Sequence, residues 1–163
     1  MRRPSSTNFD SLDYAIVRLL NADPRMTNKA LAEELGVAES TCAYRVRRLH
    51  SSGAMSPPRL ELDHALLGYG LQAIITVYMS SHSREAVDHF MATMAETPNV
   101  LRVVHLTGRS DFVIDVAVAD REELKNFVLD HVTVQPAVRG TETQVVFDAR
   151  RGNWVPSASS NHE

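Results

Sequence analysis

An internal repeat in the second half of the chain limits its possible folds more than any other feature. Each copy has an apolar strand, an amphipathic helix, a proline that ends the helix, and a further strand. The two prolines, Pro98 and Pro136, lie 38 residues apart. The strands are expected at 71–79, directly after 98–100, at 112–118 and at 141–147. The helices carry apolar stripes at Val87, Phe90, Met91 and Met94, and at Leu124, Phe127, Val128 and His131.

Two such strand–helix–strand units in tandem predict a split β-α-β, or ferredoxin-like, domain. Right-handed crossovers place both helices on one face of a four-stranded antiparallel sheet. Both faces of the strands carry bulky apolar residues, so the face without helices would expose Ile74, Tyr78, Val113 and Val146. Because an exposed apolar patch usually marks an interface, we expect a homodimer in which two sheets pack face to face.

Three helical segments precede this domain. Apolar residues recur every three or four positions across 12–20, which predicts a first helix. A second helix is expected to begin after Thr27, a good N-cap, and to end at Gly36, which can adopt the left-handed conformation found there. A third is expected from residue 39 to about 52. Two short helices joined by a short turn containing glycine predict a helix-turn-helix.

The chain is therefore expected to be an α+β protein of two domains. Leu60 and Leu62 alternate after a pair of prolines, which predicts a short strand that would form a small wing. The expected layout is a flexible arm at 1–9, a winged helix-turn-helix domain at 10–62, a linker at 63–70, the ferredoxin-like domain at 71–148 and a C-terminal tail at 149–163.

The third helix has an inward stripe of Cys42, Val46 and Leu49 and a polar outer face. Small polar side chains near the start of this helix can hydrogen-bond to base edges, and its cations can bind phosphates. This combination favours DNA binding over the alternative, a packing module whose basic face is only solvated. Arg45 lies near the core, and two roles are equally open to it: an ion pair with Glu33 or Glu34, or a phosphate contact. The residues expected at DNA are Arg25, Lys29, Ser40, Thr41, Tyr44, Arg45, Arg47 and Arg48.

The amino-acid composition further limits the classes of function that the chain can have. The net charge of −3 hides a basic front, with nine Lys and Arg against seven Asp and Glu up to residue 62, and an acidic remainder with eight against thirteen. The single cysteine excludes an intrachain disulfide and a thiolate zinc site. The seven histidines lack ligand spacing and no nucleophile motif is present, so we expect no metal, no cofactor and no enzyme. Without a signal peptide or an apolar run long enough to span a membrane, a cytoplasmic protein is expected.

The sequence motifs of both domains resemble those of one known family. In the first domain they are Leu12-Asp13, Arg25-Met26-Thr27, Leu31-Ala32, Leu35-Gly36-Val37, Cys42, Arg45-Val46-Arg47-Arg48-Leu49 and Gly53. In the second domain the segment 107–112, Thr-Gly-Arg-Ser-Asp-Phe, looks like a Gly-x-x-Asp-aromatic turn. Over about residues 10–148 the chain resembles the Lrp/AsnC, or feast/famine, transcription regulators. The resemblance implies a sequence-specific DNA-binding regulator whose second domain senses a free amino acid.

The turn at 107–112 is the expected effector site. An amino acid needs an acceptor for its ammonium group, and backbone N–H groups or a cation for its carboxylate. Gly108 allows close backbone approach, Asp111 is an acceptor and Arg109 is a possible cation. The resemblance places the pocket where dimers meet in a tetramer or octamer, with the last strand contributing. The expected effector residues are Thr107, Gly108, Arg109, Asp111, Phe112 and Gln144.

Two alternatives stay open, and two positions depart from the family pattern. The turn can instead be a tight hairpin in which Asp111 bonds neighbouring backbone. The protein can instead be a nucleoid-organising DNA binder that needs no effector. Ala38 stands where the family has a small capping residue such as serine, a loss of about 1 kcal/mol. Pro57-Pro58 stands where the family wing has glycine and an aromatic residue, so the side chains of that wing contact are missing from this chain.

Overall fold

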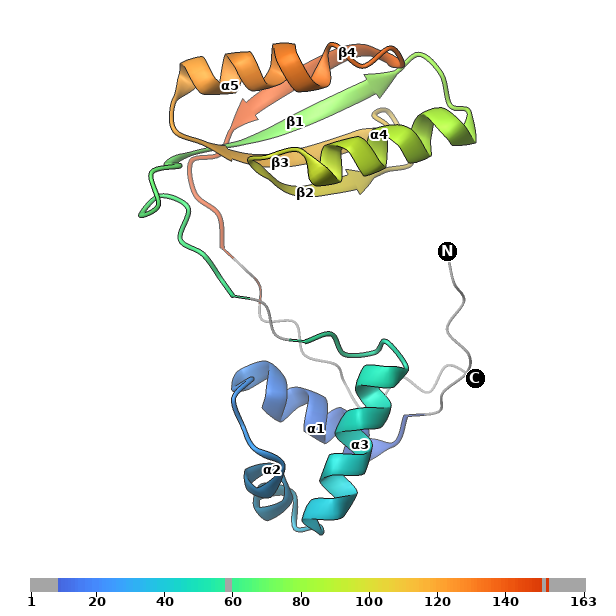
Figure 1. Cartoon of the computed structure of the whole chain (residues 1–163), viewed down its shortest axis with the longest axis vertical. Helices are drawn as coiled ribbons and strands as arrows, with labels where there is room; N and C mark the ends of the chain where they lie inside the picture. The colour runs from blue at the N-terminus through green and yellow to red at the C-terminus, as the bar shows by residue number, and fades with distance from the viewer. Residues whose placement is uncertain (1–8, 58–59, 151, 153–163) are drawn as a thin grey trace. The chain divides into compact units, whose positions relative to one another are not determined.

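The computed structural model describes residues 9–57, 60–150 and 152, so the expected N-terminal arm and C-terminal tail lie largely outside the described residues. The chain divides into two compact units, one containing the residues up to Leu60 and the other Glu61–Arg150 (Figure 1). No helix in the described part of either unit is long and apolar enough to cross a membrane.

The first unit contains a helix-turn-helix, as the sequence predicts. Its helices are α1 (Ser11–Ala22), α2 (Asn28–Leu35) and α3 (Glu39–Ser51). Side chains from all three meet in a small core made of Ile16, Leu31, Ala32, Cys42 and Leu49. The inward stripe read from the sequence of α3 is confirmed, because Cys42 and Leu49 are buried and Val46 packs against this cluster.

The ends of α2 follow the expected chemistry, and the start of α3 is weak. Thr27 Oγ1 accepts a hydrogen bond from Ala30 N at 3.2 Å and caps α2. Gly36 ends α2 in the left-handed conformation with φ of 66°, which a side chain would strain. Ala38 is the N-cap of α3 and makes no side-chain capping bond. The helix that presents the polar face therefore begins without the stabilisation that its two predecessors have.

The strand expected at Leu60 and Leu62 is not formed. Both side chains are exposed, and no strand of the described residues pairs with this segment. Its backbone therefore has no neighbouring strand with which to form interstrand hydrogen bonds. The following residues instead form a hydrogen-bonded turn, in which Asp63 Oδ1 accepts from Leu66 N at 3.0 Å and His64 O accepts from Tyr69 N at 2.8 Å. A strand-built wing is thus absent from the described residues.

The second unit has the predicted tandem repeat. Its elements are β1 (Leu71–Met79), α4 (Arg84–Glu96), β2 (Val100–His105), β3 (Phe112–Val118), α5 (Arg121–Phe127), a π-helical turn η1 (Val128–Val132) and β4 (Val138–Val145). The strands form one antiparallel sheet in the order β2-β3-β1-β4. The last strand begins three residues before the expected start at 141 and ends two residues before 147.

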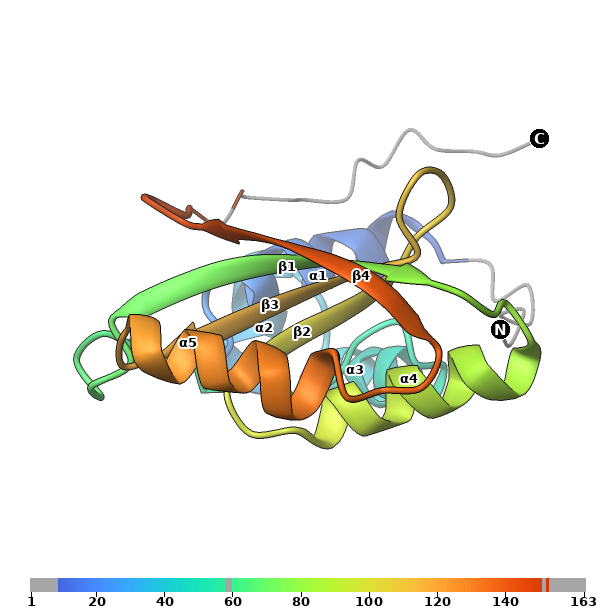
Figure 2. The same cartoon turned by 90° about the horizontal axis from the view of Figure 1, so that it is seen from above.

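Both long helices cover the same face of this sheet, as the crossover rule predicts (Figures 1 and 2). Alternate residues of β1 and β3 point into the core between the sheet and the helices. Phe90 and Met94 of α4 and Leu124 and Phe127 of α5 fill that core from the other side. Met91, expected in the same stripe, is 36% exposed at the edge of α4.

The opposite face of the sheet is mixed rather than purely apolar. Ile74, Tyr78, Val113 and Val146 are all half-buried. Strand pairing sets polar residues among them: Ile74 lies between Asp115 and Gln144, and Val113 pairs with Thr76. Gln72 Nε2 also donates to Asp115 Oδ1 at 2.8 Å on the paired strands. The open face therefore mixes polar residues with apolar ones, among them the paired Val104 and Val113.

Candidate nucleic-acid interface and effector turn

The outer face of α3 presents small polar groups, an aromatic ring and a cation. Ser40 and Arg47 are exposed, Tyr44 is 58% exposed and Thr41 is half-buried. Arg47 has no ion-pair partner among the described residues. A helix with this face uncovered can offer hydroxyl groups to base edges and a guanidinium group to phosphate.

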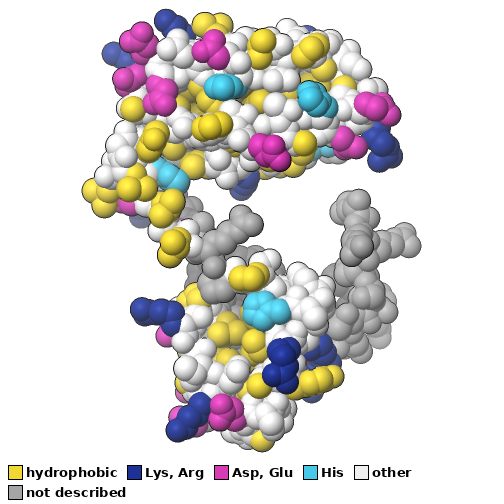
Figure 3. Space-filling view, in the orientation of Figure 1, with side chains coloured by type: hydrophobic (Ala, Val, Ile, Leu, Met, Phe, Trp, Pro, Cys, Tyr) yellow, Lys and Arg dark blue, Asp and Glu magenta, His cyan; other side chains and the backbone are white. Residues whose placement is uncertain are grey.

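Two further predicted cations lie outside α3. Lys29 is exposed in the first turn of α2. The Arg25 side chain is 94% exposed, and its Nε lies 3.6 Å from Asp23 Oδ1. An ion pair this exposed is weak, so it would not prevent Arg25 from binding a phosphate instead. Figure 3 shows Lys and Arg side chains together with Asp and Glu side chains on the visible face of both units.

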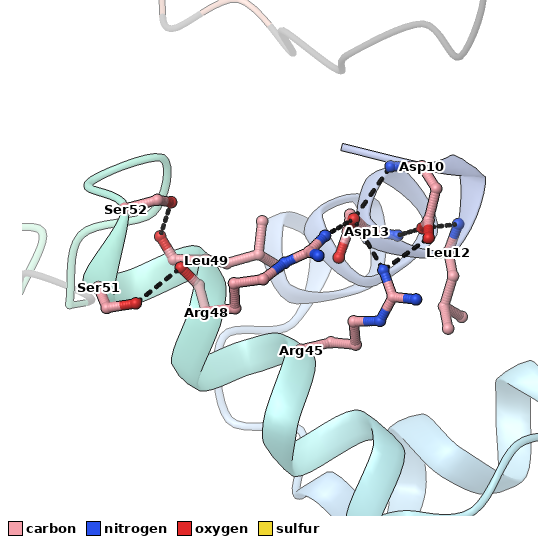
Figure 4. Close-up of polar contacts among 8 residues, drawn as sticks. All are labelled: Asp10, Leu12, Asp13, Arg45, Arg48, Leu49, Ser51 and Ser52. Atoms are coloured by element: carbon pink, nitrogen blue, oxygen red, sulfur yellow. Dashed lines mark hydrogen bonds and ion pairs between the residues drawn. The ribbon is translucent and has the colours of Figure 1, made fainter. Parts of the chain in front are cut away.

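Arg45 and Arg48 point toward α1 instead of outward (Figure 4). Arg45 Nη1 lies 2.6 Å from Asp10 Oδ2 and 3.1 Å from Asp13 Oδ2. Arg48 Nη2 donates to Asp13 Oδ2. Of the two roles left open for Arg45, the structure shows an ion pair, but its partners are Asp10 and Asp13 and not Glu33 or Glu34, which are exposed on α2.

Arg48, expected to contact DNA, also lies against its own unit. Its side chain is only 28% exposed, and its guanidinium carbon lies 5.9 Å from the centre of the Phe9 ring. The reason is the capping box at the start of α1, which brings two carboxylates beside α3. A long arginine side chain reaches them along the helix surface, and a charge-assisted hydrogen bond holds it there.

Asp13 is the residue that the sequence analysis missed in this unit. It is a buried charged residue, with 1% of its surface exposed, and its Oδ2 also accepts from Asp10 N at 3.0 Å. The Asp10-x-x-Asp13 spacing is a capping-box signal, but spacing alone does not reveal a partner 35 residues away. The bond from Arg45 is the main reason that the pKa of Asp10 lies below its usual range.

In the second unit, Asp111 is held in place by its own chain. Asp111 Oδ2 accepts from Met79 N at 2.7 Å, and Oδ1 lies 2.7 Å from His82 Nε2. The bond from Met79 N is the main reason that the pKa of Asp111 is lowered. These contacts fasten the turn to the end of β1 and to the residues that follow it, rather than to the backbone of the turn itself as in the tight-hairpin alternative.

The other turn residues divide into exposed and buried groups. Thr107, Gly108 and Arg109 are exposed, and Gly108 has φ of 126°, where a side chain would be strained. Phe112, in contrast, is fully buried, and its ring centre lies 4.7 Å from those of Phe90 and His105. Phe112 therefore supports the turn from the core and offers no surface to a ligand in this chain.

Gln144 does not lie at this turn within one chain. It pairs with Ile74, whereas Asp111 bonds to Met79, five residues further along β1 and about 17 Å away at the usual strand rise. The antiparallel direction of β4 brings its first residues to the turn instead. Arg139, whose charge also lowers the pKa of Asp111, and His82 are the neighbours that the sequence analysis missed.

A cavity of about 210 Å³ opens elsewhere in the second unit. Its lining residues are Pro98, Asn99, Glu123, Asn126, Phe127, Asp130 and His131. The cavity lies beside the start of β2, whereas the turn at Gly108 follows the end of that strand. It is therefore distinct from the predicted effector site.

Both units match known sequence families in the order that the fold suggests. Residues 9–50 match the AsnC-type helix-turn-helix domain, and residues 72–152 match the Lrp/AsnC ligand binding domain. The HTH-type transcriptional regulator AldR of Mycolicibacterium smegmatis is 39% identical over 145 residues, which span 89% of this chain and 85% of that protein. AldR of Mycobacterium tuberculosis is 37% identical, with 88% and 80% spanned.

Solved structures show the same similarity over the whole fold. A transcriptional regulator from Neisseria meningitidis, solved as a complex with L-Met, aligns with a TM-score of 0.81 at 25% identity and covers 93% of this chain and 98% of that one. The crystal structure of MtbAldR aligns with a TM-score of 0.73 at 32% identity and covers 91% of this chain and 100% of that one.

Proposed function

Because the chain belongs to the Lrp/AsnC family of transcriptional regulators, which bind DNA through a helix-turn-helix, we propose that the outer face of α3 reads a specific DNA sequence. The observation that carries this proposal is the exposure of Ser40, Tyr44 and Arg47 on one helix face. The relatives are named as transcriptional regulators, so the chain is a regulator and not an enzyme. A cytoplasmic location, where the chromosome lies, is part of the proposal.

The proposed contacts fall into two classes. Ser40, Thr41 and Tyr44 reach base edges in the major groove and set sequence preference. Arg47, with Arg25 and Lys29 from neighbouring segments, contacts phosphates and sets affinity for any sequence. Arg45 and Arg48 are not assigned to phosphate here, because each is bonded to carboxylates of α1.

Salt-dependent binding of purified protein to a duplex tests the proposal. Arg47→Ala should weaken binding to all sequences and lower the slope of log affinity against log salt by roughly 1. Arg121→Ala, which removes an exposed arginine of α5, is the matched control and should leave binding unchanged. Tyr44→Ala and Ser40→Ala should alter the sequences recovered from a randomised-site selection. Binding that is unchanged in Arg47→Ala would refute the assignment of this face.

We also propose that the turn at 107–111 senses a free amino acid. Arg109 or Arg139 would bind the ligand carboxylate, and Asp111 would bind the ammonium group after exchanging its contact with His82. Support comes from the related regulator from Neisseria meningitidis, which was solved with L-Met. Because Gln144 lies away from this turn in its own chain, it would have to come from another subunit, as the expected assembly into a tetramer or octamer would allow.

A thermal-shift screen of the twenty amino acids tests the effector proposal. A hit in the wild type that is lost in Asp111→Asn, with DNA binding intact, is the expected result, because a ligand that binds one state better shifts the population toward it. Thr93→Ala, far from the turn on α4, serves as a control. No hit at millimolar concentration, together with long DNase footprints that amino acids do not change, would favour the effector-independent nucleoid-organising alternative.

A further inference from the structure

Three arginines within four positions of α3 have different surroundings. Arg47 is exposed, whereas the side chains of Arg45 and Arg48 are only 21% and 28% exposed. Both of the less exposed arginines bond to carboxylates at the start of α1. The sequence alone gives all three the same charge, and the fold leaves one of them open to an external anion.

The centre of this arrangement is one oxygen atom. Asp13 Oδ2 accepts from Asp10 N at 3.0 Å, from Arg45 Nη1 at 3.1 Å and from Arg48 Nη2. Asp13 Oδ1 and Arg48 Nε are buried and have no hydrogen-bond partner among the described residues. The bonds therefore gather on one side of the carboxylate, where they tie α3 to the N-terminus of α1.

The cluster is also electrically balanced. Two carboxylates, of Asp10 and Asp13, face two guanidinium groups, of Arg45 and Arg48. A carboxylate and a phosphate offer the same kind of acceptor oxygens to arginine, so an arginine committed to one is not available to the other without loss. Removing one negative charge would leave the cluster with a net charge of +1 on the side of α3.

We propose that Asp13 is a positioning residue for DNA recognition: with Asp10 it holds Arg45 and Arg48 against α1, fixes α3 on its unit, and withholds these two cations from phosphate. Arg47 is then the α3 arginine that contacts the DNA backbone. The consequence is a lower affinity for arbitrary sequences and a larger share of binding set by base contacts. This inference rests on the proposed DNA-reading role of α3.

The test is the salt dependence of binding to a specific and to an unrelated duplex, measured with the full chain. Asp13→Asn keeps the shape of the side chain and removes its charge. It should steepen the salt slope by about 0.9, the value for one more phosphate contact, so that affinity falls about 3.5-fold more between 50 and 200 mM salt. The ratio of specific to nonspecific affinity should become smaller. A purely structural role would lower the ratio at most, by misplacing α3, and would leave the slope unchanged, so the slope decides.

The neighbouring arginines supply the matched comparison. Arg47→Met should make the slope shallower by about 0.9, whereas Arg48→Met, which keeps most of the aliphatic stem, should leave the slope unchanged while lowering the melting temperature. Equal losses of slope in both variants would overturn the inference, and so would a folded Asp13→Asn protein with wild-type slope and ratio. If Asp13→Asn does not fold, the comparison of Arg47→Met with Arg48→Met decides. An unchanged slope in Arg47→Met would instead contradict the proposed reading face.

Discussion

Protonation of the Asp10 side chain affects how firmly α3 is held, because Asp10 bonds to Arg45 of that helix. Its Oδ1 caps α1 by accepting from Leu12 N and Asp13 N, both at 3.1 Å, while Oδ2 bonds to Arg45. The bond from Arg45 holds the pKa of Asp10 below its usual range. Because the pKa is lower in the folded than in the unfolded chain, Asp10 contributes stability above its unfolded-state pKa and loses it as the pH falls through its folded-state pKa.

We predict that the melting temperature of the protein falls as the pH is lowered below about 4, the ordinary pKa of aspartate, and that Asp10→Asn makes this fall shallower. Thermal unfolding followed by circular dichroism at a series of pH values measures both effects. Asp23→Asn is the control, because the partner of Asp23 is an almost fully exposed arginine. An Asp10→Asn protein with the wild-type pH dependence would contradict the prediction.

The helix α3 is stabilised mainly by side-chain contacts along its length and not by a cap at its N-terminus. Ala38 has φ of −69° and ψ of 143° at the N-cap position, a geometry in which a serine hydroxyl could accept from the first turn of the helix. The helix is fixed instead by the core around Cys42 and Leu49 and by the ion pairs of Arg45 and Arg48. An added cap should therefore stabilise α3 without moving it.

We predict that Ala38→Ser raises the free energy of unfolding by about 1 kcal/mol, and that Thr27→Ala, which removes the cap of α2, lowers it by a similar amount. Urea unfolding curves of the two variants and the wild type measure these changes. Ala54→Ser, at an exposed position beyond α3, is the control and should change little. A destabilised Ala38→Ser protein would show that the start of α3 is packed in a way that the exposed alanine does not indicate.

The elements also show why some features could be predicted and others could not. The strands and helices of the second unit were predictable because apolar periods of 2 and 3.6 residues are local signals. Asp13 and Arg139 were not, because their roles depend on residues distant in the sequence. The strand at Leu60 and Leu62 was predicted from alternation alone, and alternation does not supply the neighbouring strand that a sheet requires.

For the whole molecule, the open face of the sheet is the surface that the second unit leaves without a helix. Ile74, Tyr78 and Val113 lie there half-buried, with Thr76 and Asp115 among them. We propose that two chains pair through this face, as expected from the sequence. Two helix-turn-helix units on one dimer would bind half-sites separated by about one helical turn of DNA or a multiple of it.

We predict that the purified protein is at least a dimer by light scattering, and that Val113→Glu shifts it toward monomer by burying an unpaired charge in the interface. DNA affinity should fall with it, because a monomer binds only one half-site. Leu129→Glu is the matched control: Leu129 is 54% exposed on the helix side of the sheet, and its replacement should leave the assembly intact. Dissociation caused by Leu129→Glu alone would locate the interface on the helices.

The two carboxylates at the beginning of α1 have two structural roles, and this limits which substitutions the sequence can accept. Asp10 and Asp13 form the capping box of the first helix and also anchor the arginines of the third. A substitution of Asp10 or Asp13 that loosens the contacts to α3 therefore also weakens the cap of α1. If the cluster limits nonspecific DNA binding as proposed, a change at Asp10 or Asp13 that relaxes selectivity also lowers folding stability, and only a compensating substitution elsewhere would restore it.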